Sequence, residues 1–130
     1  MTTEKRYECT VNVTAVFIPE QSNVEQNQYA FAYHVEIENT GNIAAQLISR
    51  HWIISQADGI TNEVKGLGVI GEQPFLKPDE YFEYTSGTVI NTPVGQMQGT
   101  YQMVAEDGIK FEAIIHPFVL AMPRVLHYRC

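Results

Sequence analysis

Three glycines in residues 65–74 (KGLGVIGEQP) have a spacing that could cradle a phosphate. Gly66, Gly68 and Gly71 follow the order G-x-G-x-x-G, and Lys65 adds an adjacent positive charge. In dinucleotide-binding folds this spacing works because the loop leads from a strand into a helix, whose free N–H groups face the phosphate. These four residues are therefore the candidate ligand-binding residues, with pyrophosphate or a nucleotide as the ligand.

The residues after the third glycine do not favour such a helix. Pro74 and Pro78 preclude an ordinary helix there, and Glu72 would place negative charge beside the phosphate. No Lys-Ser or Lys-Thr pair follows, which excludes a P-loop. Two interpretations stay open: the glycines supply backbone shapes that other residues avoid, or they form an anion-binding nest without a helix.

A second set of chemically capable residues lies on one predicted strand. His34, Glu36 and Glu38 alternate along residues 29–38 and therefore share one face. Neighbours on one face of a strand are spaced by about 7 Å, which is too far apart for all three to hold one ion at about 2.0–2.6 Å. We therefore expect the polar outer face of a sheet here, and no metal site.

Catalytic residues are not predicted. Ser86, in the stretch Tyr84–Gly87, lacks the first glycine of a G-x-S-x-G nucleophile elbow. Cys9 lies in an alternating apolar segment and is expected to be a small core residue, and neither Cys9 nor Cys130 belongs to a CxxC pair. No acid–base or nucleophile–base pair stands out, so we expect a protein that is not an enzyme and needs no cofactor.

The elements that must position these residues are strands. Alternating or β-branched apolar runs predict strands at residues 9–17, 29–38, 46–56, 61–65, 80–90, 99–106 and 110–121. Asp58-Gly59 and Asp107-Gly108 are strong hairpin dipeptides, and only residues 19–27 could hold a short helical turn.

About seven short strands without crossover helices predict an all-β fold, an antiparallel β-sandwich formed by residues 1–130 as one domain. Trp52 falls in the third strand, where immunoglobulin-like sandwiches bury a tryptophan, and Tyr101 after Gly99 suggests a tyrosine corner. The Cys…Trp…Cys spacing of true immunoglobulin domains is absent. A fibronectin type III-like sandwich is therefore expected among the immunoglobulin-like folds.

Charge and composition limit the partners. The chain has a net charge of −7 and no basic cluster longer than Lys5-Arg6, so we expect no nucleic-acid partner. It has neither an apolar leader nor an 18-residue apolar run, which predicts a cytoplasmic protein without membrane insertion. Sheet edges and many aromatic residues favour a homodimer.

Several segments together resemble the ApaG family, also called the DUF525 domain. They follow the family's order over nearly the whole chain: Tyr29–Tyr33, Arg50-His51-Trp52, Gly66–Pro74, Tyr84–Gly87, Met97-Gln98-Gly99 with Tyr101, and Phe118–Pro123.

The resemblance implies a fibronectin type III-like sandwich and a stand-alone bacterial protein. Similar eukaryotic domains are fused to F-box proteins and polymerase-delta-interacting proteins, where they look like protein-interaction modules. The resemblance also implies a loose link to cobalt resistance and magnesium efflux, without an assigned biochemical activity. We therefore expect a non-enzymatic binding module with an unidentified protein partner in divalent-cation homeostasis. The alternative is a protein that binds a phosphate ligand through Lys65, Gly66, Gly68 and Gly71.

Overall fold

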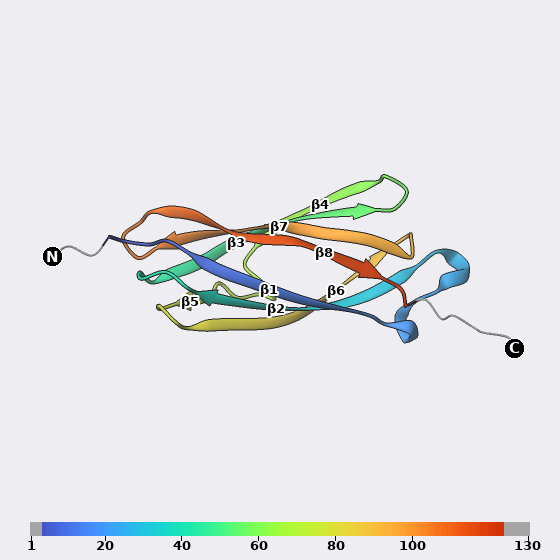
Figure 1. Ribbon diagram of the computed structural model, residues 1–130, viewed down its shortest axis with the longest axis horizontal. Helices are drawn as coiled ribbons and strands as arrows, with labels where there is room; N and C mark the ends of the chain where they lie inside the picture. The colour runs from blue at the N-terminus through green and yellow to red at the C-terminus, as the bar shows by residue number, and fades with distance from the viewer. Residues whose placement is uncertain (1–3, 124–130) are drawn as a thin grey trace, which may run out of the picture.

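A computed structural model describes residues 4–123, and Figure 1 shows them folded as strands joined by turns. The strands are β1 (Cys9–Phe17), β2 (Tyr29–Asn39), β3 (Ala45–Gln56), β4 (Thr61–Leu67), β5 (Phe75–Leu76), β6 (Tyr81–Ile90), β7 (Val94–Ala105) and β8 (Lys110–Ala121). The segment predicted as a helical turn contains two short 3₁₀ turns, η1 (Pro19–Gln21) and η2 (Val24–Gln26). Within residues 4–123, no helix is long and apolar enough to cross a membrane.

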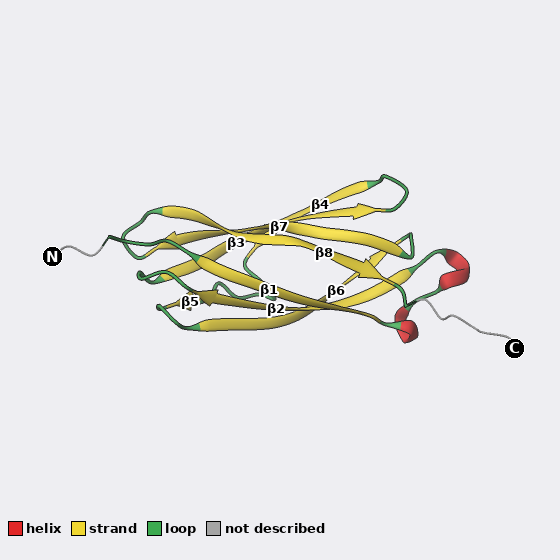
Figure 2. Ribbon diagram, viewed as in Figure 1, coloured by secondary structure: helices red, strands yellow, loops and turns green. Residues whose placement is uncertain are grey.

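The strands form two antiparallel sheets that pack face to face (Figure 2). One sheet has the order β1-β2-β6, and the other has the order β4-β3-β7-β8, with β5 paired to β3. In an immunoglobulin constant domain the fourth strand joins the sheet of the first two strands. Here β4 extends the sheet of β3 instead. This arrangement confirms the fibronectin type III-like prediction.

The core lies between the sheets because apolar residues alternate along the strands. Trp52 on β3 is 2% exposed, and its ring makes edge contacts with Tyr33 of β2 at 5.4 Å and Tyr101 of β7 at 6.2 Å between ring centroids. Burying three aromatic side chains stabilises the sandwich through both area and ring geometry. Cys9 is also buried, as its strand pattern predicted.

The tyrosine-corner prediction was wrong. Tyr101 lies in the middle of β7, which begins at Val94 rather than at residue 99. Its hydroxyl meets the hydroxyl of Tyr84 across the two sheets, whereas a tyrosine corner bonds to a nearby backbone group. The register shift between Met97 and Gly99, where β7 pairs with β8, interrupts the alternation and hid the first half of the strand.

Candidate functional site

The glycine segment follows the edge strand β4 and does not enter a helix. Gly66 lies within β4, Gly68 follows its last residue, and Gly71 lies in the turn before the two-residue strand β5. A dinucleotide site needs a helix N-terminus behind the third glycine. The structure therefore places the three glycines along a strand and a tight turn.

This turn is a two-residue hairpin closed on itself. The Val69 N–H donates to the Glu72 carbonyl at 2.8 Å, and the Glu72 N–H donates back to Val69 at 2.9 Å. The central residues, Ile70 and Gly71, have φ of +43° and +79°. Positive φ at both central positions defines a type I′ turn, which suits glycine but not a β-branched residue. Ile70 is therefore strained, a feature that the residue pattern did not reveal.

Steric contact with the backbone explains Gly68, and Gly66 leaves room for the end of the Arg50 side chain. A Cβ on Gly68 would lie 2.3 Å from the Glu72 carbonyl oxygen, and Gly68 has φ of +62°. A Cβ on Gly66 would lie 2.8 Å from the Arg50 guanidinium, which rests over it. Arg50 donates from Nη1 to the carbonyls of Leu67 at 3.0 Å and Gly68 at 2.8 Å. Arg50 thus holds the end of β4 in place, a role not predicted from the sequence.

The backbone amides around the glycines are largely used within the protein. The Gly68 N–H donates to the Ile48 carbonyl at 2.8 Å, and those of Val69 and Glu72 close the turn. An anion nest needs such amides free to point at the ligand. Lys65 and Gly66 instead line an open hollow on the outer sheet face with His51 and Gln102. The structure therefore separates Lys65 and Gly66 from the turn that contains Gly71.

Three apolar side chains in and next to the turn face solvent. We call Leu67, Ile70 and Phe75 the turn surface; they are 75%, 60% and 47% exposed. They come from the end of β4, the tip of the turn and the start of β5. Grouped apolar side chains on a surface mark interaction sites more often than single ones do. The turn surface is therefore a candidate for contact with another protein.

A histidine and two glutamates approach one another on the outer face of the other sheet. His34, Glu36 and Glu83 each offer a ligand atom, and these atoms lie within 4.8 Å of one another. Glu83 was not predicted because it lies on β6, directly opposite Glu36 in the register. Glu38 is not part of this group. The sequence predicted no metal site, and this prediction stays to be tested on His34, Glu36 and Glu83.

The thiol of the buried Cys9 is expected to be unreactive at neutral pH. Burial raises the pKa of the Cys9 thiol to about 11. At neutral pH the group is therefore protonated, and a protonated thiol is a poor nucleophile. Cys130 lies outside the described residues.

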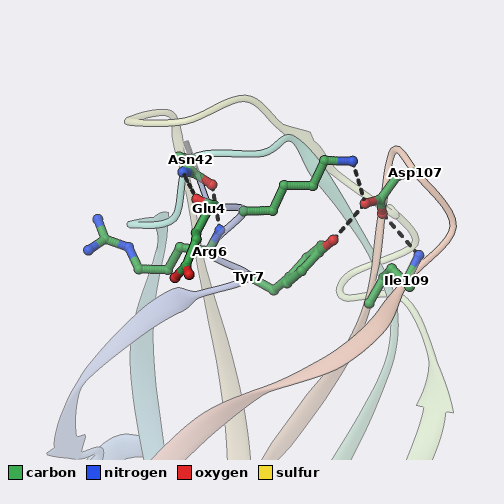
Figure 3. Close-up of polar contacts among 7 residues, drawn as sticks. Glu4, Arg6, Tyr7, Asn42, Asp107 and Ile109 are labelled. Carbon is green, nitrogen blue, oxygen red and sulfur yellow. Dashed lines mark hydrogen bonds and ion pairs between the residues drawn. The ribbon is translucent and has the colours of Figure 1, made fainter. Parts of the chain in front are cut away.

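Polar contacts tie the N-terminal segment to the end of the sandwich, as Figure 3 shows. Asp107, in the β7–β8 turn, accepts hydrogen bonds from the Tyr7 hydroxyl at 2.6 Å and from Lys5 Nζ at 3.0 Å. The Ile109 N–H donates to its other oxygen at 3.1 Å. The Tyr7 hydrogen bond is the main reason that the pKa of Asp107 falls to about 2. These contacts fasten the N-terminal segment to the β7–β8 turn.

The two sheets and the turn surface define the class of protein: a fibronectin type III-like sandwich with a strained glycine turn beyond its edge strand β4. Residues 19–105 match the family described as the ApaG domain, DUF525, and the chain belongs to the ApaG family.

Relatives and solved structures agree with this assignment. Protein ApaG of Methylobacillus flagellatus is 64% identical over 98% of this chain and 100% of its own length. Protein ApaG of Thiobacillus denitrificans is 59% identical, with 95% of this chain and 97% of its own length covered. A crystal structure of an ApaA protein from Bordetella pertussis is 56% identical and superposes with a TM-score of 0.89, covering 93% and 98% of the two chains.

Proposed function

We propose that this chain is a non-enzymatic binding module that engages another protein through the turn surface. The observation that supports the proposal is Ile70, a β-branched residue with φ of +43° whose side chain is 60% exposed. The left-handed conformation costs a non-glycine residue about 1–2 kcal/mol. Such strain persists mainly where function requires it.

The fold itself gains little from an isoleucine at this position. The Ile70 side chain lies outside the core, and asparagine or glycine would adopt the same turn with less strain. An apolar partner that covers Ile70 together with Leu67 and Phe75 would remove their exposed surface from water. The partner is therefore expected to be a protein with a complementary apolar patch.

Capture from a lysate of the native cell tests this proposal. Immobilised parent chain is compared with Ile70→Asn and Phe75→Asn, which change only exposed side chains. We expect both variants to lose the captured protein. The matched control is Val119→Asn, a change at a 61% exposed residue of β8, which should retain it. Equal capture by all four chains would overturn the proposal.

The cellular role that we propose for this binding is bacterial divalent-cation homeostasis in the cytoplasm, following the family resemblance. An indirect role predicts only weak ion binding by the chain itself. Calorimetric titration with Co²⁺ and Mg²⁺ tests this, with Glu83→Ala as the variant that disrupts the His34, Glu36 and Glu83 group. Micromolar Co²⁺ binding that is lost in Glu83→Ala would show a direct metal site instead.

A phosphate ligand is the alternative function. The observation in its favour is the open hollow lined by Lys65, Arg50 and His51, which contains two permanent positive charges. Titration with pyrophosphate and with a nucleotide measures this binding directly, using Lys65→Ala as the control. We expect no saturable heat, because Arg50 and the nearby amides already donate to protein carbonyls.

A further inference from the structure

The outer edge of β4 has no strand beside it, and only the Leu67 carbonyl at its end is engaged, by Arg50 at 3.0 Å, within the residues that the structure describes. β4 ends one sheet, and six of its seven residues are exposed, Gly66 being the exception. The opposite edge of the same sheet, β8, has β1 alongside it (Figure 1). An uncovered edge presents unpaired N–H and C=O groups to any strand that can align with them.

The direction of the backbone groups along β4 follows from its pairing with β3. The Gln56 N–H donates to the Ile60 carbonyl and the Gly68 N–H donates to the Ile48 carbonyl, both at 2.8 Å. In an antiparallel pair, alternate residues direct their backbone groups toward the partner strand. Even-numbered residues therefore bond to β3. The backbone groups of Thr61, Glu63 and Lys65 point to the open edge, as does the N–H of Leu67, whose carbonyl accepts from Arg50.

We propose that β4 pairs antiparallel with β4 of a second copy of this chain, about a two-fold axis at Val64. In this register Glu63 lies opposite Lys65 of the second copy, and Thr61 lies opposite Leu67. Each outward-pointing residue then meets another outward-pointing residue, so the hydrogen-bond ladder continues across the axis. The two-fold axis repeats the Glu63–Lys65 pair, which gives opposite charges on both sides of Val64.

The charges on β4 also favour this pairing register over registers in which the two-fold axis is shifted along the strand. A shift that centres the axis on Glu63 places two glutamates opposite each other, and a shift that centres it on Lys65 does the same with two lysines. A two-fold axis placed between two residues would set each outward-pointing residue opposite one that points toward β3. The hydrogen-bond ladder could not form in that register. Within residues 4–123, Lys65 forms no ion pair, and Glu63 has only His51 nearby, with Nε2 to Oε2 at 3.5 Å.

A single strand pair is a small interface, so the dimer is weak and depends on concentration. Analytical ultracentrifugation from micromolar to millimolar chain concentration should show the parent's average mass rising toward that of a dimer. Lys65→Glu gives an edge with two glutamates, and Glu63→Lys gives an edge with two lysines. Each variant alone should remain a monomer, because its own edges repel.

An equimolar mixture of the two variants makes the sharper test. A glutamate edge facing a lysine edge has fully complementary charges, so the mixture should dimerise although neither component does. The double exchange Glu63→Lys/Lys65→Glu should also dimerise. Lys110→Glu, on β8, changes the net charge by the same amount as Lys65→Glu and should dimerise like the parent.

The proposal is overturned if the parent stays monomeric at every concentration, or if Lys65→Glu dimerises as well as the parent. Loss of the dimer in Lys110→Glu would attribute the effect to net charge, and failure of the mixture to dimerise would reject the register. This inference does not depend on capture of a partner by the turn surface, since Ile70→Asn should leave the dimer intact.

Discussion

Two kinds of turn connect consecutive strands of the sheet that contains β3, and they differ in how well their residues suit the backbone. The β3–β4 and β7–β8 hairpins turn at Asp58-Gly59 and Asp107-Gly108, where each glycine has φ of +89°. In both hairpins the aspartate accepts a hydrogen bond from the amide two residues later, at 3.0 and 3.1 Å. The glycine supplies the positive φ that ends such a three-residue loop.

The turn beyond β4 has a less suitable residue. It demands two consecutive positive φ values, and Ile70 adopts one of them. The Asp-Gly turns contain the residues that stabilise the chain, whereas this turn exposes an apolar side chain under strain. The stability of the fold therefore explains the choice of residues in the two Asp-Gly turns. Binding of a partner better explains the isoleucine in the turn beyond β4.

Replacing Gly68 with alanine is expected to have the largest effect on stability. The new Cβ would meet the Glu72 carbonyl oxygen at 2.3 Å and would also be strained by φ of +62°. We expect the free energy of unfolding to fall by about 2 kcal/mol or more, since both penalties act together. Denaturant titration measures the loss. A change below about 0.5 kcal/mol would contradict the contact.

Gly71→Ala separates conformation from contact in the same turn. Gly71 has φ of +79°, but a Cβ there meets nothing within 4 Å. Only the conformational penalty remains, so we expect a loss of about 1 kcal/mol. Measured beside Gly68→Ala, it should be clearly the milder variant. If it were equal or worse, the steric argument at Gly68 would be wrong.

Asp107→Asn should change the acid dependence of stability. The pKa of Asp107 falls from 3.8 to about 2, chiefly through the Tyr7 hydrogen bond, so the ionised form stabilises the folded state. This contribution is complete above pH 3.8 and is lost as the pH falls toward 2. In Asp107→Asn the free energy of unfolding, measured by denaturant titration at several pH values, should therefore change less with pH in that interval. An acid dependence of stability that is the same in Asp107→Asn and in the parent would contradict this account.

Much of the fold could be predicted from local pattern. Period-two alternation located β1, β2 and β8, and the Asp-Gly dipeptides located both hairpins. The register shift in β7 and the two residues of β5 were missed because a bulge breaks the alternation and so short a strand has none. Tyr101 was misassigned for the same reason.

The candidate site was predicted only in part. The sequence indicated the glycines and Lys65, but the positive φ of Ile70 and the position of Arg50 over Gly66 depend on how β3 and β4 align. Glu83 meets His34 and Glu36 through pairing between β2 and β6. Such cross-strand neighbours are distant in sequence, so spacing within one strand could not reveal them.

The free energy of unfolding of Ile70→Asn tests the central claim most directly. Asparagine adopts positive φ more readily than isoleucine and loses no core contact here, so relief of strain should dominate. We predict that denaturant titration gives a variant more stable than the parent, by a few tenths of a kcal/mol up to about 1 kcal/mol. A less stable variant would contradict the account, because it would show that Ile70 serves the fold rather than a partner.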